Sequence, residues 1–216
     1  MTVTMIDEVS ELTEEQFALL ERARARTAPT EKAVLFSDLM VRALLAGIKT
    51  QTRRVVRNIV NVALQRCPFG QVGDRLWVRE CWCQPDPGHP HDVLYRADVD
   101  ETMLEVERDL RRECGPGSYV PWRPSIHMPR WAARIVLEIT EVRLQHLWEM
   151  SESDVAAEGV EAYRGDMLLN GEAAIGFVAA PKRFQLIWDG NHHGRPGCLY
   201  RDNPLVWAIT FRRLKP

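Results

Sequence analysis

The sequence predicts an α+β fold, with a β-barrel at its centre and short helices around it. Two observations support this prediction: strand-like and helix-like segments are interspersed along the chain, and they do not form a repeating βαβ pattern. No internal repeat is visible either. The strand-like segments are residues 33–36, 75–80, 133–142 and 205–211, and the helix-like segments are residues 38–47, 147–160 and 182–189.

The first elements lead into a basic segment. Residues 33–36 form a short apolar run, which predicts a buried strand. Ser37 or Asp38 can cap the helix that follows, and Gly47 is placed to end it. We interpret residues 52–56 as a strand or a loop that enters the core.

Two strands in the middle of the chain are predicted from alternating apolar residues. In residues 75–80, Leu76 and Val78 share one face, and Trp77 lies on the other. Residues 133–142 predict a longer strand, because isoleucine and leucine recur on one side of it.

The last third of the chain predicts two helices and a closing strand. Ser151 can cap a helix within residues 147–160, and Gly159 can end it. A second helix is expected at residues 182–189 and a loop at 191–203. The strand that follows this loop is rich in β-branched and aromatic residues.

Two stretches stand apart from these elements. We interpret residues 1–32 as a helical N-terminal extension, in which Thr13 can cap a helix with Gln16 three residues later. Residues 33–216 then form one domain. Residues 84–121 are an insertion-like stretch of prolines, glycines and charged residues, which we expect to fold over the barrel as a cover.

Composition excludes several classes of protein. The 216 residues are 45% hydrophobic and 27% charged, as in an ordinary globular protein with an ample core. The formal net charge of -2 argues against a protein that coats nucleic acid, but a local basic cleft remains open because the positive charge is segregated. No apolar run approaches the roughly 20 residues that cross a bilayer, and no secretion signal is visible, so no membrane partner is expected.

The cysteines and histidines predict neither a disulfide framework nor a metal site. Five scattered cysteines indicate a cytoplasmic protein with reduced thiols. Cys81-x-Cys83 lacks a second cysteine pair, and the histidines at 89–91 and 192–193 lie in loops rich in proline and glycine. No glycine-rich phosphate loop or G-x-S-x-G motif is present, and we expect no cofactor.

A basic segment at residues 47–54 carries the clearest chemical signal. It contains Lys49 and two arginines, and no acid occurs between Leu39 and Gly73. Repulsion among these cations should lower the pKa of Lys49, which would suit a base or a nucleophile. The same cluster can hold a phosphate, or it can be an ordinary basic helix end.

The pattern Gly47-x-Lys49-x-x-x-x-Arg54 resembles the signature of the ASCH family, a branch of the PUA-like superfamily. Further blocks resemble phage and prophage members of that family in the same order, so that the resemblance covers about residues 33–214. These blocks are residues 67–80, 122–131, 157–159 and 206–211. The resemblance implies a PUA-like β-barrel, a viral or prophage origin, and the binding of RNA or a modified nucleotide.

The resemblance extends to the bacterial N4-acetylcytidine amidohydrolases of this family, and it implies a catalytic set of Lys49, Thr52 and Glu158. Lys49 would take a proton, Thr52 would position or supply an oxygen, and Glu158 would carry a proton to the departing amine. This chain departs from those enzymes by its greater length and by Arg53, where they have an apolar residue. Glu158 can equally be a solvated glutamate at a helix end.

Other residues are candidates for the same cleft. His127, Arg130 and Trp131 lie in a proline-bracketed loop that could stack a base and hold a phosphate, or its tryptophans could simply fill the core. Glu80 either faces the cleft or forms a salt bridge with Arg54 or with neighbours of Arg79.

The sequence therefore predicts an ASCH-type protein that binds RNA or a modified nucleotide in a basic cleft, with Arg53 and Arg54 among its ligand-binding residues. The first alternative is an amidohydrolase acting on N4-acetylcytidine-like nucleosides. The second is a metal-independent ribonuclease, in which Lys49 and His127 carry protons.

Overall fold

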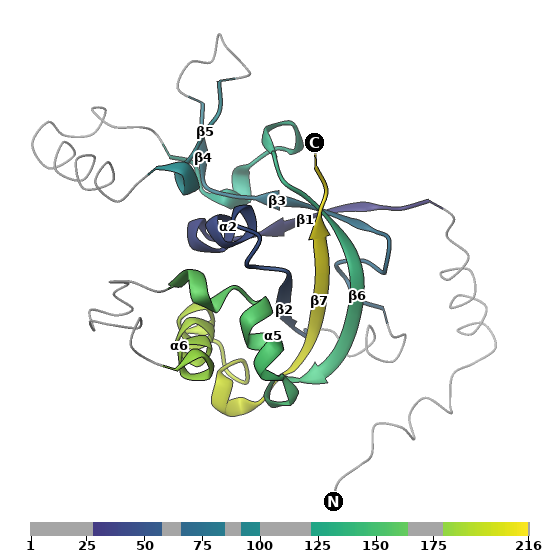
Figure 1. Cartoon of the computed structure of the whole chain (residues 1–216), viewed down its shortest axis with the longest axis vertical. Coiled ribbons are helices and arrows are strands. Elements are labelled where there is room, and N and C mark those ends of the chain that lie inside the picture. Colours follow the sequence, from purple (N-terminus) through teal and green to yellow (C-terminus); the bar gives the residue numbers. More distant parts are fainter. Residues whose placement is uncertain (1–27, 58–65, 85–91, 100–121, 164–178, 216) are drawn as a thin grey trace, which may run out of the picture.

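The computed structural model describes residues 28–57, 66–84, 92–99, 122–163 and 179–215, and Figure 1 shows their arrangement. The helix expected within residues 1–32 and most of the insertion at 84–121 lie outside the described residues. Among the helices that the structure does describe, none is both long enough and apolar enough to cross a membrane.

Five strands form the main sheet, and two short strands form a second one. In spatial order the main sheet contains β1 (Glu31–Leu35), β3 (Arg75–Arg79), β6 (Val136–His146), β7 (Leu205–Arg213) and β2 (Gln51–Val55). β1 and β3 are parallel, and the other three pairs are antiparallel. β4 (Trp82–Cys83) pairs with β5 (Leu94–Tyr95).

The main sheet is curved but open, so the expectation of a closed barrel is wrong. β1 and β2 are its two edges, and they do not pair with each other. The carbonyl of Leu35 in β1 instead accepts a hydrogen bond of 2.8 Å from the guanidinium of Arg54 in β2. The Arg54 side chain thus connects the edge strands β1 and β2, which in a closed barrel would be joined by backbone hydrogen bonds. We call the space between β1 and β2 the seam.

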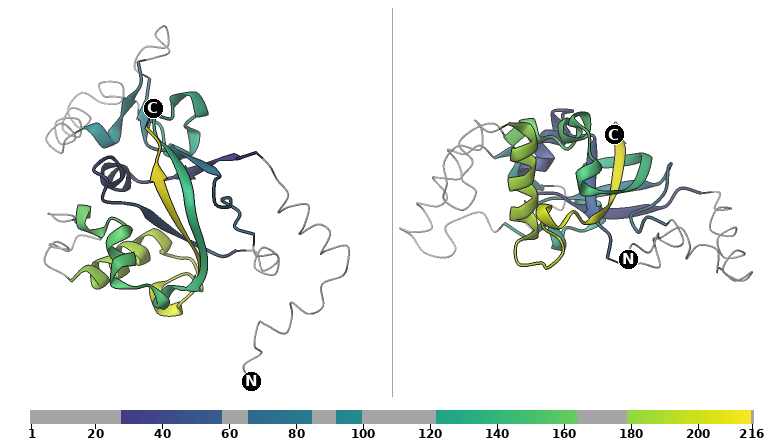
Figure 2. Two further views of the ribbon diagram at one scale, coloured as in Figure 1. Left: turned by 45° about the vertical axis from the view of Figure 1, so that its right-hand side comes forward. Right: turned by 90° about the horizontal axis from the view of Figure 1, so that it is seen from below.

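The helices lie around this curved sheet. They are α2 (Asp38–Leu45), α5 (Glu152–Ala157) and α6 (Ala180–His192). Figures 1 and 2 show α5 and α6 side by side on one side of the sheet, near β2. Short 3-10 helices connect the elements at Arg96–Asp98, Ser125–His127, Arg130–Ala132, Leu147–Glu149, Val160–Tyr163 and Tyr200–Asp202.

Apolar residues of the strands form the main core beneath the sheet. Leu76, Val78, Leu137 and Ile209 are fully buried. Burial of a side chain of this size stabilises the fold by roughly 2 kcal/mol relative to leaving it exposed. A second cluster, centred on Phe184 and Trp188 of α6, joins that helix to α5 and to the start of β7.

Several predicted elements are confirmed, and their bounds differ for local reasons. The strand expected at 133–142 occurs at 136–146, because a 3-10 turn precedes it and β7 pairs with it as far as His146. The segment 147–160 is divided into a 3-10 turn and the short helix α5, which begins after the capping residue Ser151. The helix expected at 182–189 continues through Gly190 to His192.

Candidate functional site

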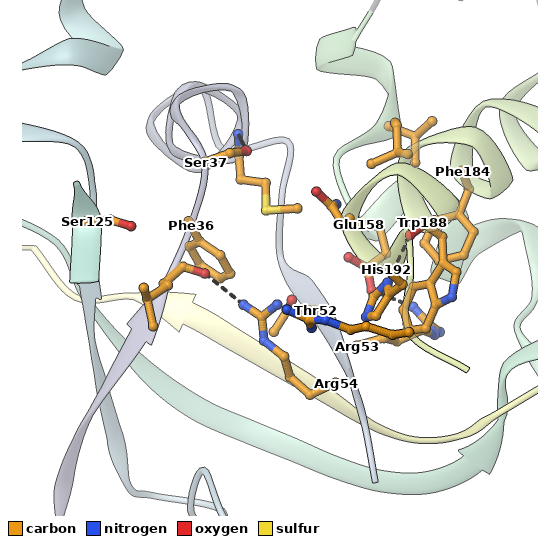
Figure 3. A pocket seen from close by; sticks show the side chains of 16 residues that line it. Phe36, Ser37, Thr52, Arg53, Arg54, Ser125, Glu158, Phe184, Trp188 and His192 are labelled. Atoms are coloured by element: carbon orange, nitrogen blue, oxygen red, sulfur yellow. Dashed lines mark hydrogen bonds and ion pairs between the residues drawn. The ribbon is translucent and has the colours of Figure 1, made fainter. Parts of the chain in front are cut away.

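A cavity of about 340 Å³ lies at the seam. Leu35 and Phe36 line it from β1 and the residue after it, and Thr52, Arg53 and Arg54 line it from β2. The opposite wall comes from the end of α5 and from α6, as Figure 3 shows. We call it the carboxylate cavity, because Glu158 faces it.

The turn after α2 sets the start of β2, and therefore the positions of its basic residues. Gly47 adopts a φ of 73°, and its N–H donates to the carbonyl of Leu44, while the N–H of Ile48 donates to that of Ala43. This pair of bonds is a Schellman motif, which ends the helix and reverses the chain. The chain then enters β2 with Lys49 turned inward.

Lys49 lies behind the cavity wall, and it does not line the cavity. Its side chain is 0% exposed, and its ammonium group donates to the carbonyls of Gln51 and Glu158 and to Oε2 of Glu158, at 2.8, 2.9 and 2.8 Å. These three acceptors match the three N–H bonds of a charged lysine. Lys49 therefore holds Glu158 in place.

The pKa of Lys49 is lowered, as the sequence predicts, but the main cause is burial. The ion pair with Glu158 opposes this effect, and the charges of Arg54 and Arg53 add to it. Repulsion among the cations, on which the sequence prediction relied, is thus the smaller contribution.

Gly159 allows Glu158 to approach Lys49 so closely. Its φ is 81°, and a Cβ added to it would lie 2.9 Å from Cβ of Lys49 and 3.1 Å from Cβ of Ala43. Only glycine satisfies both the backbone conformation and the close packing. The N–H of Thr50 also donates to the carbonyl of Ala157, which joins the end of α5 to the start of β2.

Glu158 is the centre of a buried charge network. Its Oε1 accepts from Nη1 of Arg53 at 3.0 Å, and Nη2 of Arg53 lies 3.2 Å from Oδ2 of Asp154. Oδ1 of Asp154 accepts from Arg143 at 2.6 Å. Nε and Nη2 of Arg53 are buried, and neither donates a hydrogen bond within the described part of the chain. A buried donor without an acceptor is costly, so a bound ligand or water would stabilise this site.

Arg54 extends from the same strand to the other side of the cavity. Figure 3 shows its guanidinium beside Phe36, whereas Arg53 runs toward Glu158 and His192. The guanidinium carbon of Arg54 lies 5.5 Å from the ring centroid of Phe36, within the range of a cation–π interaction. Thr52 is buried between the two arginines, and it also lines the cavity.

His192 is a cavity residue that sequence reasoning missed. Its ring stacks on Trp188 with centroids 4.2 Å apart, and its Nδ1 lies 2.9 Å from the carbonyl of Trp188. Because a carbonyl only accepts, Nδ1 carries a hydrogen and Nε2 is free to face a ligand. The spacing Trp188-x-x-x-His192 was the available signal, but Gly190 between them suggested a loop.

The predicted binding residues divide into two groups. Arg53 and Arg54 line the cavity, whereas Glu80, His127 and Arg130 do not line it. Glu80 is buried in a bidentate pair with Arg134, with distances of 3.0 and 2.9 Å. Burial raises the pKa of Glu80, and the hydrogen bonds and charge of Arg134 oppose that change.

The loop from Trp122 to Trp131 reaches the cavity through Ser125. His127 is exposed, and Arg130 forms a bidentate pair with Glu31 at 2.7 and 3.0 Å. Trp131 is 57% exposed and packs edge-on against Trp82, away from the cavity. Lys49 is buried and His127 is exposed, and the ribonuclease hypothesis stays a prediction.

Metal ligands do not gather at this site. Within the described ranges, no three His, Cys, Asp or Glu residues lie close enough together to hold a metal ion. Glu158, the one described acid that lines the cavity, is engaged by Lys49 and Arg53 instead.

Two solved structures are similar to this chain across most of its length. One is a crystal structure from Enterococcus faecalis V583 assigned to the family DUF984, with 10% identity, a TM-score of 0.41, and coverage of 97% of this chain and 94% of that one. The other is an ASCH domain from Lactobacillus crispatus JV V101, with 13% identity, a TM-score of 0.40, and coverage of 97% and 90%.

No family model and no curated protein sequence matches the chain. A likeness at this level says nothing of ligand or activity, so any function is argued from the residues of the cavity.

Proposed function

We propose that the carboxylate cavity binds the base of a nucleotide or of single-stranded RNA. The observation that carries this proposal is the combination of aromatic walls with fixed charged groups. The aromatic residues Phe36, Phe184 and Trp188 line the cavity, and so do the charged residues Arg53 and Glu158. A nucleobase is recognised by stacking on aromatic rings and by hydrogen bonds to its edge.

The cavity has a suitable size and charge for such a ligand. Its volume of about 340 Å³ lies at the lower end of small-molecule sites, which suits one base with part of its sugar. Nε of Arg53 has no described acceptor, and it favours an oxygen-rich ligand. Arg54 can reach the same ligand from the opposite wall.

Equilibrium binding of cytidine 5′-monophosphate and of a short single-stranded RNA tests the proposal. We expect Arg54→Ala to weaken binding about tenfold or more, since one hydrogen bond between charged groups contributes about 1.5–3 kcal/mol. Arg212→Ala is the matched control, because Arg212 pairs with Glu138 and does not line this cavity. The absence of binding by the folded wild type, or equal losses in both variants, would contradict the proposal.

A second candidate is hydrolysis of an acylated base, and one contact favours it. Lys49 and Glu158 form an ion pair of 2.8 Å, and both Thr52 and Glu158 border the cavity. In this hypothesis water attacks the acyl carbon, the carbon–nitrogen bond breaks, and Glu158 passes the proton of the water to the departing amine. Lys49 then positions Glu158, which changes the role expected for it from the sequence.

Release of cytidine from N4-acetylcytidine, followed by chromatography, tests this candidate. Hydrolysis predicts release by the wild type, a loss of at least about a hundredfold in Glu158→Gln, and a loss in Thr52→Val, which preserves the shape of the side chain. If the wild type binds cytidine monophosphate but releases no cytidine from the acetylated nucleoside, the site is a binding site only.

A further inference from the structure

A second cavity, of about 510 Å³, adjoins the first at the outer end of the seam. Leu35, Arg54, His192 and Arg195 line both cavities, so a single ligand can extend from one into the other. The remaining wall includes Arg57, which follows β2. We call it the arginine cavity.

The charge of this second cavity is of one sign. Arg54, Arg57 and Arg195 line it together with His192, and none of the lining residues is acidic. Three positive side chains around one small volume give it a positive potential, which attracts an anion.

The arginines of this cavity are also available for a ligand. Arg57 and Arg195 are exposed, and neither forms an ion pair with a described residue. Elsewhere, Arg130, Arg134 and Arg143 all pair with carboxylates. Arg57 and Arg195 therefore face the arginine cavity without a described carboxylate as partner.

Arg54 is held in position between the two cavities. One N–H of its guanidinium donates to the carbonyl of Leu35, and its plane lies beside the ring of Phe36. A guanidinium carries five N–H donors, so four remain for a ligand. Because the side chain is already ordered, little conformational entropy is lost when an anion binds.

We propose that the arginine cavity is a phosphate subsite, so that the ligand of the seam is a phosphorylated nucleoside and not a free nucleoside. The proposal rests on the proposed function, because it takes the base to occupy the carboxylate cavity. The ligand is oriented by the difference in charge: Arg57 lines only the second of the two cavities, and no acid lines that cavity, so the phosphate is attracted there. Both a mononucleotide and an RNA strand supply such a phosphate.

Calorimetric titration of the full-length protein with cytidine, cytidine 5′-monophosphate and the dinucleotide cytidylyl-cytidine tests the subsite. We expect cytidine monophosphate or the dinucleotide to bind at least about tenfold more tightly than cytidine. This preference should shrink as salt is raised, while the affinity for cytidine should stay constant.

Arg57→Ala assigns the preference to this cavity, since Arg57 lines only the arginine cavity and is exposed. We expect this variant to bind cytidine like the wild type and to lose about tenfold in affinity for the phosphorylated ligand. Arg201→Ala removes the same charge from an exposed arginine that lines neither cavity, and it should change nothing.

The outcomes separate the subsite from the proposed function. Equal affinities of the wild type for cytidine and both phosphorylated ligands, or an unchanged preference in Arg57→Ala, would overturn the subsite and leave the base site standing. No binding of any of the three ligands would overturn both. Within the supporting outcomes, tighter binding of the monophosphate indicates a mononucleotide ligand, and tighter binding of the dinucleotide indicates an RNA strand.

Discussion

Glu80 and Glu158 are two buried glutamates that the sequence made candidates for the same cleft, and the structure gives them different partners. Both lie close to arginines, and both are almost fully buried. Glu80 pairs with one arginine, Arg134, whose side chain is 25% exposed and also reaches Asp98. Glu158 pairs with Lys49 and Arg53, whose side chains are both 0% exposed.

The difference lies in what each carboxylate faces. Glu80 lies beneath the loop that contains Met128, where the N–H of Glu80 contacts the methionine sulfur, and it joins β3 to the segment before β6. Glu158 faces a cavity in which aromatic rings and arginines meet. A buried ion pair is weak support for stability in itself. We infer that the pair at Glu80 specifies the packing of that loop, whereas the network at Glu158 prepares a ligand site.

The largest expected effect comes from Glu158→Gln. This change leaves two buried cations with too little negative charge, and it should lower the free energy of unfolding by about 3–5 kcal/mol. Lys49→Met combined with it should recover part of the loss, because one of the unpaired charges is removed. Urea denaturation of both single variants and the double variant measures the coupling; strictly additive losses would contradict the network.

Glu80→Gln should cost less, about 2 kcal/mol, because Arg134 is partly exposed and keeps Asp98 as a partner. The affinity for cytidine 5′-monophosphate should not change, since Glu80 does not line the carboxylate cavity. Urea denaturation measures the loss in the free energy of unfolding, and titration of the same preparation with cytidine 5′-monophosphate measures the affinity. A clear loss of affinity for cytidine 5′-monophosphate in Glu80→Gln would contradict the inference that only Glu158 belongs to the ligand site.

Asp154 sets a pH dependence of stability within the network at Glu158. Burial alone would raise its pKa, but hydrogen bonds from the Ser151 N–H and from Arg143, together with the charge of Arg53, lower it to about 2 from 3.8. The ionised form is therefore favoured in the folded state, and it contributes about 2 kcal/mol. This contribution is complete above pH 3.8 and is lost as the pH falls through about 2.

Acid denaturation of Asp154→Asn checks this effect. The variant should lose about 2 kcal/mol at neutral pH and should show a flatter stability profile between about pH 4 and about pH 2. Glu152→Gln in the same helix is the control, because Glu152 is exposed. If the stability of Asp154→Asn depends on pH as that of the wild type does, Asp154 does not contribute to the network as described.

The smallest expected effect concerns His192, which borders both cavities. Burial lowers its pKa, its hydrogen bond to the backbone of Trp188 opposes this, and the charges of Arg195, Arg54 and Arg57 lower it further. His192 is therefore neutral at pH 7, and it gains a positive charge only below its ordinary pKa of 6.5. The affinity for a phosphodiester should rise a few-fold as the pH falls from about 7.5 to below the lowered pKa of His192.

A dinucleotide is the suitable probe for this measurement, because its diester does not titrate in that range, whereas a terminal phosphate has a pKa near 6. Titration of the wild type and of His192→Gln with cytidylyl-cytidine gives the comparison. The rise should disappear in the variant. If it persists, another group is responsible.

The strands and caps were predictable because their signals are local. Apolar alternation marked β3, and Ser37, Gly47 and Ser151 marked helix ends where the structure has them. The open edge was not predictable in this way. Whether β1 and β2 pair depends on Arg54 reaching the carbonyl of Leu35, a contact between residues 19 positions apart.

The candidate site was predictable only in part. The ion pair of Lys49 with Glu158 joins residues 109 positions apart, and a resemblance to a family, not a local pattern, suggested that the two belong together. The burial of Lys49, from which we infer that it positions Glu158, depends on the close approach of Gly159. Arg195 and His192 were missed because they lie in a stretch that reads as a loop.

A crystal structure of the protein with cytidine 5′-monophosphate tests the central claim most directly. We predict that the base lies among Phe36, Phe184 and Trp188 in the carboxylate cavity, and that the phosphate contacts Arg54, Arg57 or Arg195. A nucleotide bound instead at the exposed loop of His127 and Trp131, with both cavities at the seam empty, would contradict it.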